Sequence, residues 1–139
     1  MLNMNSIFLG GDSYKREYPP FTKYKMNKRH INHPVTIWMR QSLDNSLWAI
    51  EHGLALEGQF ITRYGHGHNS AKAIRWARDF GTLPQRKGLT PFAICVRDDL
   101  KTIDPVESYR RSYCFDKASF ASWDKGVLPP TWFKPYRSL

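Results

Sequence analysis

The chain has 139 residues, of which 41% are hydrophobic and 14% aromatic, and it carries a net charge of +9. This composition is that of a folded globular protein rather than a disordered one, and the length predicts a single domain, 1–139, with one core. No apolar run reaches the length of a membrane span, and the N-terminus lacks the charged-then-apolar pattern of a secretory signal. We therefore expect no membrane association and a cytoplasmic location.

The positive charge is unevenly distributed along the chain. Residues 12–29 hold six Lys or Arg against two acids, and residues 63–87 hold six against one, whereas residues 31–62 hold one against three. Clustered basic residues are typical of proteins that bind nucleic acid, because they displace counterions from phosphates. The alternative is a generically basic protein, since net charge bears on association and not on fold.

The first 30 residues predict an irregular arm that is both basic and aromatic. Tyr14, Tyr18, Phe21 and Tyr24 interleave with Lys and Arg in this segment, and no helical period is present. The rings could stack on bases while the cations meet phosphates, or the arm could wrap across the body and fill surface grooves. Residues 31–139 are expected to form a helical body with an aromatic C-terminal tail.

Pro34 begins the strongest helical pattern of the chain. From Ile37 to Ile61, apolar residues recur at intervals of three and four positions, which predicts one long buried helix over about 35–64. Ser42 or Asp44 could divide this helix into a short and a longer part, and Gly65 is its expected stop.

Shorter helices are expected further along. Asn69 or Ser70 should begin a helix that ends at Gly81, and Asp104-Pro105 is a strong helix start, because the carboxylate accepts free backbone N–H groups and proline suits the first helical position. Together with the long helix, these elements predict a mainly α fold with extended termini.

The remaining segments carry weaker signals. The apolar run 92–96 is either a buried strand or an extended core segment, and residues 129–136 form an extended aromatic tail. Cys95 and Cys114 lie in apolar surroundings, so we expect both to be buried free thiols.

The run 63–70, Arg-Tyr-Gly-His-Gly-His-Asn-Ser, has the highest density of polar chemistry in the chain. Arginine and two imidazoles supply hydrogen-bond donors and a proton switch, and the glycines allow a ligand to approach closely. The run therefore suits a phosphate, a nucleotide or a metal. The structural alternative is a helix C-cap at Gly65 followed by a new N-cap at Asn69 or Ser70.

A metal site is the least favoured of these. Zinc needs about four ligands, and no cysteine lies near the histidine pairs of the sequence. We therefore expect no metal and no cofactor. For acid–base catalysis the candidates are His33 and His68, with Glu107 as the residue that orients them, although an acid at a helix start is more often a partner of the helix dipole.

Several motifs together resemble a family of uncharacterised bacteriophage proteins. The family pattern includes NHPxxxW, RYGKxHK, TPF and AYRxYY, and the resemblance covers about residues 30–133. Here it is carried by the following segments: Asn32-His33-Pro34 with Trp38, Asn45 and Trp48, Arg63-Tyr64-Gly65 with His68, Thr90-Pro91-Phe92, Val106–Arg110, Trp123, and Pro130-Thr131-Trp132. The family is distantly similar to phage pyrimidine-dimer DNA glycosylases, which implies a DNA partner in an infected bacterial host.

This chain departs from the family pattern in two places. Residues 1–25 do not match the first helix of longer members, and Met1-Leu2 with Glu17 do not reproduce the N-terminal amine and first-helix glutamate of the glycosylases. The family's Lys-x-His-Lys is His66-Gly67-His68-Asn69 here, which removes two ammonium groups that would bind phosphate. Both departures weigh against glycosylase chemistry.

Three functions are therefore considered. The first is a small phage-type protein that binds DNA through an Arg/His-rich helix–helix corner. The second is an enzyme acting on DNA or a nucleotide, with glycosylase-like or modification activity. The third is a host-takeover protein that binds and inhibits a host protein through exposed aromatic anchors. For the first, the expected anion-binding residues are Arg63, Tyr64, His66, His68, Lys72, Arg75, Arg78, Arg110 and Arg111.

Overall fold

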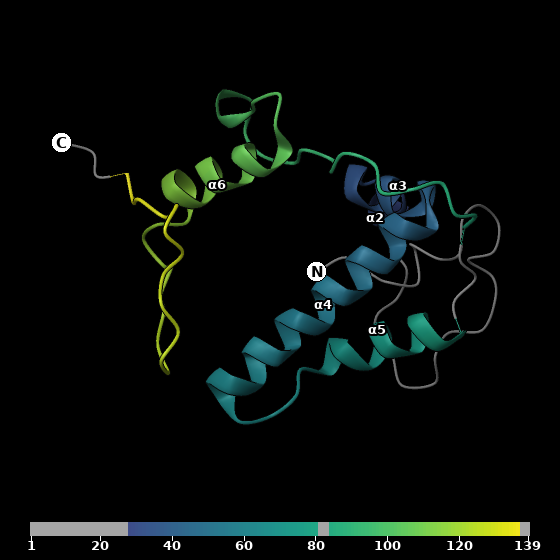
Figure 1. The fold of residues 1–139 in the computed structure, drawn as a ribbon, viewed down its shortest axis with the longest axis horizontal. Coiled ribbons are helices and arrows are strands. Elements are labelled where there is room, and N and C mark those ends of the chain that lie inside the picture. The colour runs from purple at the N-terminus through teal and green to yellow at the C-terminus, as the bar shows by residue number, and fades with distance from the viewer. Residues whose placement is uncertain (1–27, 81–83, 137–139) are drawn as a thin grey trace. The chain divides into compact units, whose positions relative to one another are not determined.

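The computed structural model describes residues 28–80 and 84–136 (Figure 1). Within these ranges the structure is mainly α, as predicted, and contains no strand. The elements in chain order are α2 (Lys28–Ile31), α3 (Pro34–Gln41), α4 (Leu43–Tyr64), α5 (Asn69–Phe80), the 3₁₀ turn η2 (Asp98–Leu100) and α6 (Pro105–Asp116). The arm expected over 1–30 lies outside the described residues, except for its last three, which belong to α2 instead of an irregular segment.

Internal contacts divide the chain into two compact units, residues 1–90 and 91–139. Each unit is described by itself below, and the expectation of a single domain stays a prediction. No helix in the described part of the chain is long and apolar enough to cross a membrane.

The long helix expected over 35–64 is two helices, α3 and α4, which are separated at Ser42. Ser42 has an extended backbone, with φ of −150° and ψ of 145°, and its hydroxyl accepts the N–H of Asp44 at 3.2 Å. A serine in this conformation satisfies a free backbone donor of the following helix and so ends one helix while beginning the next. The predicted break is confirmed at Ser42.

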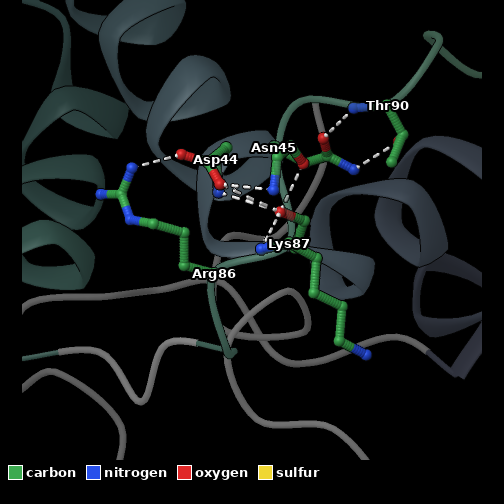
Figure 2. A network of polar contacts seen from close by, with 7 residues as sticks. Asp44, Asn45, Arg86, Lys87 and Thr90 are labelled. Carbon is green, nitrogen blue, oxygen red and sulfur yellow. Dashed lines mark hydrogen bonds and ion pairs between the residues drawn. The ribbon is translucent and has the colours of Figure 1, made fainter.

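The α3–α4 corner holds residues 84–90 through a polar network that we call the clasp, formed by Ser42, Asp44 and Asn45 with residues 85–90 (Figure 2). Asn45 is fully buried; its amide N–H groups donate to the Trp38 carbonyl and the Thr90 hydroxyl, both at 2.8 Å, and its carbonyl accepts the Thr90 N–H at 2.9 Å. All the polar atoms of this side chain are therefore used in joining three segments.

Neighbouring residues extend the clasp. The Asp44 carboxylate accepts hydrogen bonds from the Arg86 guanidinium at 2.7 Å and from the Gly88 N–H at 2.8 Å. The Ser42 hydroxyl donates a hydrogen bond to the Gly88 carbonyl at 2.7 Å. Only the backbone of Lys87 takes part, and its side chain extends away from the network (Figure 2). The clasp fixes the start of α4, from which the rest of that helix projects.

α5 runs back alongside α4 (Figure 1). The two helices approach closely at Gly53, where a Cβ atom would lie 2.8 Å from Cδ1 of Ile74, and the side of α5 that is buried carries Ala71, Ala73 and Ala77. Small residues on both helices permit this short separation.

The expectation that the long helix is largely buried is wrong for the second half of α4. Leu56 is 56% exposed and Ile61 is 43% exposed, whereas Ile50 in the first half is completely buried. The reason is that α3 packs on the first half, while in the described part of this unit α5 is the helix that packs along the second half. A helix with one partner keeps one face in solvent.

In the second unit, α6 begins as the sequence predicts. Asp104 caps it by accepting the Val106 N–H at 2.8 Å, and Pro105 is its first residue. The aromatic tail packs against this helix: the ring of Phe115 stacks on Tyr136 at 4.4 Å, and the Tyr136 N–H donates to the Cys114 carbonyl at 3.0 Å.

The run 92–96 is an extended segment and not a strand. It is held by Tyr109 of α6, whose hydroxyl donates to the Ala93 carbonyl at 2.7 Å and accepts the Cys95 N–H at 3.1 Å. Cys95 and Cys114 are free, as expected, but Cys95 is exposed and Cys114 only half-buried. They are not buried because this unit has a small core, in which Leu100 is the buried hydrophobic residue among those described.

We expect Tyr109 to make the stability of the second unit sensitive to alkaline pH. Burial raises the pKa of this phenol above its ordinary value near 10, and the Cys95 N–H, which lowers it, offsets only part of the effect. A raised pKa in the folded state stabilises the fold below pH 10, and this contribution is lost as the pH rises through the folded pKa. We expect urea unfolding between pH 8 and pH 11, followed by circular dichroism, to show a steeper loss of stability for the unmodified chain than for Tyr109→Phe. Equal slopes would contradict this.

Candidate functional site

The candidate site is the corner between α4 and α5, which comprises residues 57–72. α4 ends at Gly65, whose φ of 76° lies in the left-handed region and whose N–H donates to the Ile61 carbonyl at 2.7 Å. Glycine adopts this conformation without the strain that a Cβ atom would cause. The predicted C-cap at Gly65 is confirmed.

α5 begins at Asn69, as predicted, but its cap is His68 rather than Asn69 or Ser70. The Nδ1 atom of His68 accepts the Ser70 N–H at 3.1 Å, and its carbonyl accepts the Ala71 N–H at 3.0 Å. His33 caps α3 in the same way, because its Nδ1 atom accepts the Val35 N–H at 3.3 Å. Both candidate catalytic histidines therefore occupy helix starts, with Nδ1 engaged as an acceptor.

Aromatic side chains cluster at the corner around Phe60. The ring centroids of Tyr64, His68 and His66 lie 4.5, 4.9 and 5.5 Å from that of Phe60, and both imidazoles present an edge-to-face geometry to it. Such arrangements are favourable for aromatic pairs. Tyr64 is 57% exposed and His66 is also exposed, so two rings of the cluster face solvent.

A carboxylate is buried in the same corner. Glu57 is only 8% exposed, and its Oε2 atom forms an ion pair with Nη2 of Arg75 on α5. Its other oxygen lies under the loop, because a Cβ atom on Gly67 would be 3.2 Å from it. This pair links α4, α5 and the loop between them, and it neutralises the carboxylate that the corner buries.

The other cations of the corner differ in how strongly they are held. Arg78 pairs with Asp79 at 2.9 Å, and this hydrogen bond raises the pKa of the guanidinium. Lys72 is exposed, and no ion pair joins it to another residue that the structure describes. Arg63 lies in the last turn of α4 and is half-buried. Among the expected phosphate-binding residues of this unit, Arg75 and Arg78 therefore already have anionic partners.

The structure brings together only part of the expected set. Arg63, Tyr64, His66, His68, Lys72 and Arg75 gather at the corner, and Arg78 lies one turn further along α5. Glu107, Arg110 and Arg111 belong to α6 in the second unit. There the Arg110 guanidinium lies 5.6 Å from the centroid of the Trp132 ring, and Arg111 is exposed. Neither unit by itself assembles His33, His68 and Glu107.

The Glu57–Arg75 pair is the main feature of the corner that sequence reasoning did not find. Glu57 follows Ile50 by seven residues, so it continues the buried face of α4. An acid on a buried helical face requires a cationic partner from a neighbouring element. The place of Glu57 on the buried face of α4 could therefore have indicated an ion pair, but the sequence does not identify which nearby cation is the partner.

The capping role of His68 can be separated from a chemical role of its imidazole. We expect His68→Ala to destabilise the first turn of α5 by about 1 kcal/mol, and His68→Asn to restore most of this, because asparagine is a strong N-cap. The two variants share the loss of the Phe60 contact, so their difference reports the cap alone. Amide hydrogen exchange at Ala71 and Lys72 measures the stability of this first turn in each variant. Equal exchange in the two variants would contradict the capping role.

Metal coordination has no support from the described residues, among which no three His, Cys, Asp or Glu side chains lie close enough to hold an ion. Comparison of the chain with protein-family models, with curated proteins and with solved structures finds no match. The resemblance to phage proteins stays a prediction. Several residues that carry it have structural roles here, namely Asn45 and Thr90 in the clasp, Gly65 as a C-cap and Tyr109 as the support of residues 92–96.

Proposed function

We propose that the chain is a small phage-type protein that binds DNA through the corner between α4 and α5. The observation that carries the proposal is the combination of exposed rings and exposed cations at a corner in which the carboxylate of Glu57 is buried and ion-paired. Residues 58–78 contain no Asp or Glu, but they hold four Lys or Arg and two His. Arg75 and Arg78 pair with Glu57 and Asp79, which flank this range, and the remaining positive charge attracts phosphate.

The cations of the corner differ in how available they are to bind a phosphate. Lys72 is exposed and free to move toward a phosphate, whereas Arg63, in the last turn of α4, is half-buried. Arg75 holds Glu57, so we assign it to the support of the corner instead of to direct phosphate binding. Arg78 would have to leave Asp79 in order to bind a phosphate. Lys72 is therefore the first cation to test.

The test is the salt dependence of DNA binding by the full chain. Fluorescence anisotropy with a labelled oligonucleotide, at several salt concentrations, gives both the affinity and the slope of log K against log salt. Removing one phosphate contact should weaken binding several-fold and reduce that slope by about 1. We expect this for Lys72→Gln.

Lys134→Gln is the matched control, because Lys134 is exposed, lies in the second unit and gives the same change in net charge. We expect it to alter affinity by less than about twofold, because a charge outside the interface contributes only a screened long-range term. Absence of binding at low salt, or equal effects of the two substitutions, would contradict the proposal.

A further inference from the structure

We infer that the corner prefers single-stranded to double-stranded DNA, because it presents rings that can stack on unpaired bases. This inference rests on the proposed function and specifies its substrate class. Its first support is Tyr64, the last residue of α4, whose ring centroid lies 4.5 Å from that of Phe60 at a tilt of 44° and which leaves 57% of its surface in solvent. A ring held in this way offers a surface to a base, and every base has a face that can stack on it.

The second support is the fixed position of the rings. Phe60 lies one turn before Tyr64 on the same helix, and the loop returns over them, so that His66 and His68 contact Phe60 edge-on. Tyr64 and His66 also lie within reach of each other, with centroids 6.5 Å apart. Rings that are already ordered lose little conformational entropy when a base stacks on them.

The third support is the arrangement of the two helices. Reading duplex DNA through a helix–turn–helix requires a second helix set at a large angle to the first, so that it can enter the major groove. Here α5 runs back alongside α4 (Figure 1), and Arg75 and Arg78 on α5 are held by Glu57 and Asp79. A flexible single strand can instead place a base on Tyr64 and its neighbouring phosphates near Lys72 and Arg63.

The experiment compares a 12-nucleotide mixed-sequence single strand with its duplex, at one low salt concentration, for the full chain and three variants. Tyr64→Leu removes the aromatic face but keeps apolar bulk, Tyr64→Phe keeps the face, and His66→Ala removes the second exposed ring. We expect tighter binding to the single strand, a loss of about tenfold for Tyr64→Leu, a change below about twofold for Tyr64→Phe, and an intermediate loss for His66→Ala. Duplex affinity should fall less than single-strand affinity in Tyr64→Leu and His66→Ala, because paired bases cannot stack on these rings.

Circular dichroism of each variant checks that α4 and α5 remain folded, and His66→Ala tests the stacking surface independently should Tyr64→Leu disturb the helix end. Equal or tighter binding to the duplex, or single-strand affinity unchanged in both Tyr64→Leu and His66→Ala, would overturn this inference while leaving DNA binding intact. Failure of the proposed function is a different result, in which neither DNA form binds at low salt.

Discussion

Replacing Asn45 with alanine should lower the free energy of unfolding of the first unit by about 3 kcal/mol. The substitution removes every partner that the buried amide supplies to the Thr90 N–H, the Thr90 hydroxyl and the Trp38 carbonyl. Each buried polar group left without a partner costs about 1–3 kcal/mol, and some of these groups will regain water when the clasp loosens. The segment 84–90 should then detach from the start of α4.

Urea unfolding and amide exchange at Thr90 measure this effect. Asn45→Asp keeps the shape and the acceptor but loses the donors, so at neutral pH it should be destabilising as well, because a carboxylate would face the Trp38 carbonyl. Asn32→Ala, at an exposed position of the same unit, is the control and should change stability by less than about 0.5 kcal/mol. A loss below about 1 kcal/mol for Asn45→Ala would contradict the role assigned to the clasp.

Removing the cation from the Glu57–Arg75 pair should also destabilise the first unit strongly. Arg75→Met keeps the aliphatic stem but leaves the Glu57 carboxylate, which is 8% exposed, without its partner. Breaking a fully buried pair costs about 3–5 kcal/mol, and because the Arg75 side chain is 46% exposed, water can reach part of the site. We therefore expect a loss of about 2 kcal/mol.

A double-mutant cycle isolates the interaction. Glu57→Gln in the Arg75→Met background should recover much of the loss, because a neutral amide needs no counterion, and the coupling energy should exceed about 1 kcal/mol. Arg78→Met, which breaks the exposed pair with Asp79, is the control and should cost less than about 1 kcal/mol. A coupling energy near zero would show that the pair does not link α4 to α5.

Features with local causes could be predicted from the sequence. Asp104-Pro105 begins α6, Ser42 separates α3 from α4, and Gly65 ends α4, because each of these residues acts on backbone groups a few positions away. The mainly α class follows from the same local patterns. The caps at His33 and His68 were not predicted as caps, since histidine is not among the usual N-cap residues.

Features that join distant segments could not be predicted. Asn45 and Thr90 are 45 residues apart, and Glu57 and Arg75 are 18 apart, so no short pattern identifies them as partners. Burial of α4 was overestimated for the same reason: an apolar stripe shows that a helix can be covered, but not how much of it its neighbours cover. For the candidate site, the sequence indicated the corner, whereas the structure distinguishes Arg75, which supports it, from Lys72, which is exposed.

The most direct test of the proposed site is an NMR titration of the full ¹⁵N-labelled chain with the 12-nucleotide single strand. The corner should respond first, with the largest amide shift changes over residues 60–72 and smaller ones elsewhere in the first unit. Arg75 pairs with Glu57 and is not assigned to phosphate binding. Its guanidinium should therefore remain paired with Glu57 when DNA is bound. Shift changes confined to residues 91–136, or no shift changes at low salt, would contradict the assignment of DNA binding to this corner.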